Sequence, residues 1–171
     1  GEFDLHKEGG HSEFRILHHK DNTGAEIQTS LIEAVKAHPN ITVFTNFYAI
    51  EIITQHHLGI IVTRHIHGIK CFGAYVLNEA TGEVDTFLSK LTVMATGGCE
   101  AVYGHTTNPL VATGDGIAMV YRAKGIVKDM EFIQFHPTAL YHPGDRPSYL
   151  ITEAMRGYGG ILKTKDGKEF M

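Results

Sequence analysis

Residues 91–98, LTVMATGG, indicate the fold class, because a continuous apolar run leads here directly into two glycines. An apolar run of this length predicts a strand that is buried on both faces of a sheet. Glycines directly after such a strand let the backbone approach a ligand closely, at the carboxyl edge of the sheet where α/β proteins bind ligands. A tight turn also needs glycine, so these residues alone leave Gly97 and Gly98 equally consistent with a turn and with a ligand site.

One helix is predicted upstream of this stretch, and its start carries a capping pattern. Thr23 and Glu26 have the spacing of a capping box, in which the threonine hydroxyl accepts from the glutamate amide and the glutamate reaches back. Ile27, Leu31 and Val35 then recur every four residues, which predicts one apolar helical face. A His-Pro pair after residue 37 ends the helix.

Short runs rich in β-branched and apolar residues predict the other strands, and they cover 41–45, 58–63, 69–77 and 84–88. Turn signals separate the last three runs, so we expect these to form an antiparallel meander. Further helices are expected over 116–124, with Gly125 as the C-cap, and over 152–156, whereas 129–135 is expected to be extended. The order of elements predicts an α/β fold without the GxGxxG turn of a first βαβ unit.

The composition is that of a soluble globular domain. Of the 171 residues, 43% are hydrophobic and 20% are charged. The formal net charge of -4 does not indicate a basic surface that would bind a nucleic acid. The longest apolar runs are far too short to span a membrane. The two cysteines, Cys71 and Cys99, form no CxxC pair, which fits a reducing compartment. We therefore expect a cytoplasmic protein with neither a membrane nor a nucleic-acid partner.

Twelve histidines stand out in the composition, but they are scattered along the chain. No HExxH motif occurs, and His65 and His67 lack an acidic or cysteine partner close in sequence. Solvated loop histidines are the simpler interpretation, so no metal site is expected. A histidine-rich binding module without redox chemistry stays open as a function of a different class.

A second glycine-rich pattern, ATGDG at 112–116, places small residues and a carboxylate at the start of the predicted helix over 116–124. Asp115 would complement the positive end of that helix dipole. The same residues would also suit a cofactor-binding turn, whose free amides point at an acceptor. From the residues alone the first interpretation is favoured.

Two motifs further along the chain carry candidate polar residues. His136 precedes a proline, which pushes its backbone into an extended conformation and fixes its position, as a substrate-binding donor requires. Glu153 and Arg156 are three residues apart on one helical face and could pair. Such a pair is either a surface ion pair of little energetic weight or a proton relay.

Taken in order, the motifs ATGG, TTNP, ATGDGIAM, YRAKG, DMEFIQFHPT and LITEAMRG resemble the flavoprotein family of succinate dehydrogenases, fumarate reductases and L-aspartate oxidases. The resemblance is close over 94–171. Residues 7–35, KEGGHSEFRILHHKDNTGAEIQTSLIEAV, are similar to the aspartate-oxidase branch in particular. Glu8 stands there where dehydrogenase and reductase relatives usually carry a glutamine.

The resemblance implies an FAD enzyme that oxidises L-aspartate to iminoaspartate in de novo NAD biosynthesis. Oxygen or fumarate would take the electrons, and the product could be handed over to quinolinate synthase. The implied fold is the central part of a glutathione-reductase-like FAD-binding domain over 1–130, with its β-meander, and the start of a capping, substrate-binding domain over 131–171. A soluble fumarate reductase or succinate dehydrogenase flavoprotein is the alternative within the family.

The resemblance also implies roles for particular residues. The implied FAD-binding residues are Tyr48, Ala49, Gly97, Gly98 and Asp115. The implied substrate-binding residues are Glu8, His136 and Thr152, and the implied proton relay consists of Glu153 and Arg156. The N-terminal FAD fingerprint and the main catalytic arginine of the family are missing from these 171 residues, so the chain alone is expected to be inactive.

Overall fold

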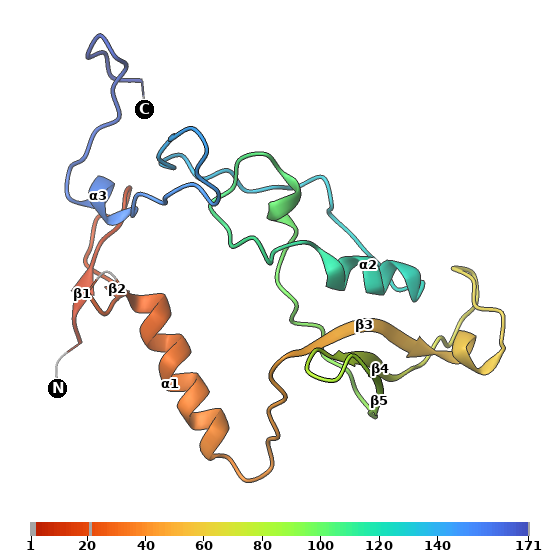
Figure 1. The fold of residues 1–171 in the computed structure, drawn as a ribbon. Coiled ribbons are helices and arrows are strands. Elements are labelled where there is room, and N and C mark those ends of the chain that lie inside the picture. Colours follow the sequence, from red (N-terminus) through yellow and green to blue (C-terminus); the bar gives the residue numbers. More distant parts are fainter. Residues whose placement is uncertain (1–2, 21, 171) are drawn as a thin grey trace. The chain divides into compact units, whose positions relative to one another are not determined.

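The computed structural model describes residues 3–20 and 22–170, and Figure 1 shows their elements along the chain. The chain divides into two compact units. The central unit is Phe44–Phe135, and the split unit combines Gly1–Val43 with His136–Met171. The cofactor-binding residues implied by the sequence all belong to the central unit, and the implied substrate and relay residues all belong to the split unit.

A three-stranded antiparallel sheet organises the central unit (Figure 1). It consists of β3 (Phe47–Thr54), β4 (Cys71–Asn78) and β5 (Val84–Leu88), in the order β3-β4-β5. β5 covers the predicted 84–88, and β4 begins and ends close to the predicted 69–77. The meander is therefore confirmed as a topology, with two of its three strands in the expected places.

The first strand of the meander lies elsewhere than predicted. Neither 41–45 nor 58–63 is a strand, and β3 occupies the residues between them. Asn46, with a φ of 61°, redirects the chain, and ladder pairing begins only at Phe47. β3 and β5 occupy both edges of β4, so the run 58–63 finds no place beside it. An apolar β-branched run forms a strand only where a neighbour takes its hydrogen bonds.

A capping box ends β3 and starts the 3-10 helix η1 (Gln55–Leu58). The Thr54 hydroxyl accepts from the His56 amide at 3.3 Å, and the Thr54 amide donates to Nδ1 of His57 at 3.1 Å. Gly59 then takes a left-handed conformation with a φ of 82°. A side-chain cap at this point turns the chain away from the sheet, which is why the apolar residues after it do not continue as a strand.

The apolar run 91–95 is also not a strand, although it was predicted to be a buried one. Leu91 is 79% exposed and Val93 is 78% exposed. A strand buried on both faces needs neighbouring strands and covering helices, and none of the described residues pairs with this run. The predicted extended segment 129–135 likewise forms no strand in the described chain.

Helix α2 (Asp115–Arg122) packs against β3 and completes the central unit. It confirms the helix predicted over 116–124, but Gly125 is not its C-cap. The C-cap is Ala123, and Lys124 takes the left-handed conformation with a φ of 63°. The Lys124 and Gly125 amides donate back to Tyr121 and Val120 at 3.1 and 2.9 Å, the pattern of a Schellman motif. The buried residues described in this unit are Ile52, Ile53, Thr54, Gly73, Ala101, Gly116 and Met119.

The split unit contains a short ladder, one long helix and one short helix. These are β1 (Leu5–His6) paired with β2 (Ile16–Leu17), α1 (Thr23–Ala37) and α3 (Ala154–Gly157). α1 confirms the predicted helix, and α3 confirms the helix predicted over 152–156 with a later start. None of the helices in the described residues is long and apolar enough to cross a membrane.

The predicted capping box of α1 is wrong. Asn22 is the N-cap residue and makes no side-chain cap, and its carbonyl accepts from the Glu26 amide at 3.0 Å. The Thr23 hydroxyl instead accepts from the preceding His19 amide at 3.1 Å. The Thr23 hydroxyl therefore accepts a hydrogen bond from the chain before the helix and not from the first helical turn. No residue of α1 is buried. Local helix propensity, and not packing of the apolar face, therefore accounts for this helix.

Candidate functional site

The two glycine-rich patterns of the sequence meet in the central unit. The Gly114 amide donates to the Gly98 carbonyl at 3.0 Å, directly before α2 begins. Gly116, in the first turn of α2, packs so closely against Thr96 that a Cβ on Gly116 would lie 1.7 Å from the threonine Oγ1. The segment with Gly97 and Gly98 therefore lies against the N-terminus of α2.

Asp115 at the start of α2 is held by hydroxyls from two sides. The Thr113 hydroxyl donates to its carboxylate, and the Tyr48 hydroxyl from β3 bonds to it as well. These two bonds, the one from Thr113 first, lower the pKa of Asp115. The bond to Asp115 is also the main cause that raises the pKa of Tyr48. Asp115 is thus an ionised acceptor fixed at a helix N-terminus.

A second link fixes α2 on β3 and was not predicted from the sequence. Nε of Arg122 donates to the Glu51 carboxylate at 2.7 Å, and its Nη2 donates to the Ile50 carbonyl at 2.9 Å. The Tyr48 bond to Asp115 links the first residue of α2 to β3, and the Arg122 bonds link the last residue of α2 to the same strand. Ala49 lies next to Tyr48 on β3 and pairs with Val76 of β4. Tyr48, Ala49 and Asp115 therefore lie where β3 and α2 are joined.

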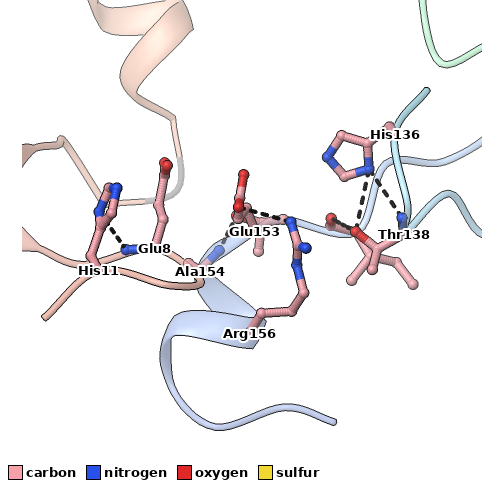
Figure 2. A network of polar contacts seen from close by, with 9 residues as sticks. Glu8, His11, His136, Thr138, Glu153, Ala154 and Arg156 are labelled. Atoms are coloured by element: carbon pink, nitrogen blue, oxygen red, sulfur yellow. Dashed lines mark hydrogen bonds and ion pairs between the residues drawn. The ribbon is translucent and has the colours of Figure 1, made fainter. Parts of the chain in front are cut away.

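In the split unit, Glu153 and Arg156 form the ion pair that their spacing predicts (Figure 2). Oε1 of Glu153 lies 2.8 Å from Nη2 of Arg156. The arginine side chain is 27% exposed and the glutamate side chain 39%, so the pair is partly withdrawn from solvent. Nε of Arg156 is buried and has no hydrogen-bond partner among the described residues. The pairing is confirmed, and its role stays a proposal.

Glu8 lies in a turn that packs against this ion pair. The Glu8 amide donates to Nδ1 of His11 at 3.4 Å, and the His11 amide donates to the Glu8 carbonyl at 3.1 Å. A Cβ on the next residue, Gly9, would lie 3.7 Å from Oε1 of Glu153. The structure therefore brings Glu8 next to Glu153, although the two are far apart in sequence (Figure 2).

His136 is held by the residue two positions after it. The Thr138 amide donates to Nδ1 of His136 at 3.2 Å, and the Thr138 hydroxyl donates to the Ile151 carbonyl at 3.1 Å (Figure 2). An Nδ1 that accepts places the proton of a neutral imidazole on Nε2, so the ring presents a donor on its other side. Thr138 is buried, and sequence reasoning missed it. A hydroxyl directly after the His-Pro pair was the only signal for it.

The chain after His136 returns to the start of α3. Ala139 and Leu150 form an antiparallel bridge, and the Ile151 amide donates to the Thr138 carbonyl at 3.0 Å. Thr152 follows directly, and its hydroxyl accepts from the Ala154 amide at 3.4 Å. His136, Thr152 and the Glu153–Arg156 pair thus belong to one locally closed segment.

The histidines do not gather into a metal site in the described part of the chain. No group of three or more His, Cys, Asp or Glu side chains there is placed to hold a metal ion. His6 and His18 stack edge to face with ring centroids 4.3 Å apart, and His18 contacts Asp4 at 3.3 Å. Both cysteines are free thiols.

Comparison with known proteins gives a consistent result. The model of the FAD binding domain family matches residues 1–171. An L-aspartate oxidase of Acinetobacter baylyi is 52% identical over 167 residues, which are 98% of this chain and 30% of that protein. L-aspartate oxidase 1 of Ralstonia nicotianae is 50% identical over 169 residues, 99% of this chain and 30% of that protein. The chain thus spans about a third of the length of these relatives.

A solved structure described as a quinol-fumarate reductase with menaquinol molecules superposes with a TM-score of 0.78. It is 32% identical in sequence, and the superposition covers 97% of this chain and 26% of the reductase chain. The fold of the described residues is therefore that of a flavoprotein FAD-binding domain, with mixed helix and sheet.

Proposed function

This chain belongs to the FAD binding domain family, and we propose that it is the central part of an L-aspartate oxidase, an enzyme that oxidises L-aspartate to iminoaspartate. The observation that carries the proposal is the placement of Glu8 beside the Glu153–Arg156 pair. A carboxylate near the substrate suits an amino acid, because it pairs with an ammonium group in a charge-assisted hydrogen bond. The identity to L-aspartate oxidases over nearly the whole chain supports the same conclusion.

FAD is the cofactor of this family, and the central unit fits it. The N-terminus of α2 offers backbone amides of the kind that bind phosphate groups. Asp115 is an ionised acceptor suited to a ligand hydroxyl, and the backbone at Gly97 and Gly98 can approach a ligand closely. Tyr48 and Ala49 would lie along the same ligand from β3. When bound, FAD supplies the hydride acceptor for the substrate α-carbon.

The split unit would bind and orient the substrate. His136 presents a donor at Nε2 and Thr152 a hydroxyl, and both suit a substrate carboxylate. Glu8 would hold the substrate amine, which loses a proton when the imine forms. Glu153, whose carboxylate contacts Arg156, would pass a proton, and Arg156 would keep that carboxylate oriented. Glu153 and Arg156 thus form the proposed relay.

The finer assignments of fold and setting belong to the same proposal. Residues 1–130 would be the central part of a glutathione-reductase-like FAD-binding domain, and residues 131–171 would be the start of a capping domain. Oxygen or fumarate would accept the electrons, and iminoaspartate would pass to quinolinate synthase. The two free cysteines are consistent with a cytoplasmic setting.

Replacing Tyr48 by Phe is expected to make FAD retention more sensitive to acid. The lowered pKa of Asp115 means that the fold favours its ionised form, a contribution that is complete above the ordinary pKa and is lost as the pH falls through the lowered pKa. Without the Tyr48 hydroxyl the pKa of Asp115 rises, so flavin release should shift to higher pH. Flavin fluorescence during acid titration of the intact enzyme measures this. Tyr149→Phe, at an exposed tyrosine, is the control, and an equal release pH in Tyr48→Phe contradicts the assignment.

Replacing Glu8 by Gln in the intact enzyme is expected to weaken the use of aspartate more than the use of fumarate. A charge-assisted hydrogen bond contributes about 1.5–3 kcal/mol, so kcat/KM for aspartate should fall by about 10- to 100-fold. Fumarate has no amine and should lose little. Steady-state kinetics with both substrates decide the matter, and equal losses on both would remove Glu8 from amine recognition.

A fumarate reductase or succinate dehydrogenase flavoprotein is the second candidate, supported by the superposition on a quinol-fumarate reductase. Its substrates are dicarboxylates without an amine. An additional carboxylate at position 8 would repel such a substrate, because like charges at close range are unfavourable. Glu8 therefore favours the oxidase, and assays with aspartate and succinate separate the two functions.

A further inference from the structure

We propose that Gly157 is a positioning residue for substrate specificity, because it lets the backbone at Glu8 lie directly on α3 beside the Glu153–Arg156 pair. The inference rests on the proposed function, in which Glu8 holds the substrate amine. It adds a residue that would touch neither substrate nor cofactor and would act only through Glu8.

The closest approach of backbone to backbone near this ion pair occurs at Gly157. A Cβ on Gly157 would lie 2.2 Å from the Lys7 carbonyl oxygen and 3.1 Å from the Cα of Glu8. Both neighbours are backbone atoms, so no side-chain rotation can relieve the clash. Any side chain at position 157 must therefore push the Lys7–Glu8 segment away from α3.

A second glycine makes the same contact from the opposite side. A Cβ on Gly9 would lie 3.2 Å from the Cβ of Arg156 and 3.8 Å from its buried Nε. Gly157 on α3 and Gly9 in the Glu8 turn thus lie on opposite sides of the same contact between α3 and that turn. Neither glycine has a positive φ, so alanine at either position acts through these contacts and not through backbone strain.

The position of Glu8 matters because its proposed partner is a single ammonium group. The local turn is closed by His11, so the turn can move as a body without losing its own hydrogen bonds. A displacement of about 1 Å at a site residue can cost about 100-fold in rate. Gly157 therefore sets how well the carboxylate meets the amine, while the dicarboxylate-binding residues His136 and Thr152 stay in place.

The test compares Gly157→Ala with wild type in the intact, flavin-loaded enzyme. We expect kcat/KM for aspartate to fall by about 10- to 100-fold, with a smaller loss for fumarate and an unchanged flavin content. Gly24→Ala in α1 is the matched control, because a Cβ there meets nothing within 4 Å, and it should leave both activities unchanged. If Gly157→Ala does not fold, Gly9→Ala replaces it, with a smaller loss expected because its contacts are longer.

A double-mutant cycle with Glu8→Gln separates positioning from simple packing. If Gly157 acts through Glu8, adding Gly157→Ala to Glu8→Gln should lower aspartate use by less than threefold. A full additional loss, or equal losses with aspartate and fumarate, overturns the inference and leaves the proposed function intact. A wild-type enzyme that fails to oxidise aspartate overturns both.

Discussion

In the intact enzyme, Glu153→Gln is expected to lower kcat for aspartate by about 100- to 10,000-fold, the usual contribution of a positioned proton-transfer group. The glutamine keeps the size of the side chain and can still accept from Arg156, but it cannot pass a proton. The ion pair of 2.8 Å orients the carboxylate in the split unit, so the loss should fall on kcat rather than on flavin binding. Stopped-flow reduction of the flavin by aspartate measures it directly.

The control for this variant is Glu169→Gln. Glu169 also forms an ion pair in the split unit, with Lys163 at 3.6 Å, but the resemblance assigns it no role. Removing an exposed pair of this kind costs at most about 1 kcal/mol of stability and should leave kcat unchanged. If Glu153→Gln retains wild-type kcat over the whole pH range, the Glu153–Arg156 pair is a structural contact and not a relay.

His136→Ala is expected to raise KM for aspartate strongly or to abolish turnover, while the flavin stays bound. His136 belongs to the split unit, and its Nδ1 already accepts from the Thr138 amide, so its other ring nitrogen is left to donate to the proposed substrate. Loss of a hydrogen bond to a charged carboxylate costs about 1.5–3 kcal/mol, and more where the carboxylate is left buried. Kinetics together with the flavin content of the purified variant give the result.

His142→Ala is the matched control for this variant, because His142 lies in the same returning loop. Its side chain is 67% exposed and pairs with Asp145 at 3.1 Å, so its removal should change neither KM nor flavin content. If His136→Ala loses its flavin, and any remaining holoenzyme turns over normally, His136 is a cofactor or structural residue. That outcome would remove it from substrate binding.

Local patterns in the sequence predicted the elements that depend on local interactions. The periodicity of Ile27, Leu31 and Val35 was sufficient for α1, and turn signals were sufficient for β4 and β5. The failures concern segments whose conformation depends on neighbours. The runs 41–45, 58–63 and 91–95 have strand composition, but no described strand pairs with them. The composition of a run does not determine whether a neighbouring strand is in place to form hydrogen bonds with it.

In the candidate site, too, contacts between residues close in sequence were predicted, and contacts between distant residues were not predicted from local patterns. The spacing of Glu153 and Arg156 predicted their ion pair, because three residues on a helix define a contact. The contact between Tyr48 and Asp115, and that between the Glu8 segment and Gly157, join residues far apart in sequence. Only the resemblance to a family pointed to Tyr48 and Glu8 beforehand. No pattern in the sequence indicated a role for Gly157 or predicted the link between Arg122 and Glu51.

We propose that this chain is part of an enzyme that holds FAD and uses it to oxidise an amino acid. The most direct measurement is the visible flavin spectrum of the intact, purified protein under anaerobic conditions, before and after addition of L-aspartate or succinate. We predict that the protein is purified with bound flavin, that aspartate bleaches the visible band, and that succinate leaves it unchanged. Bleaching by succinate but not by aspartate, or a purified protein without flavin, would contradict the proposed oxidase function.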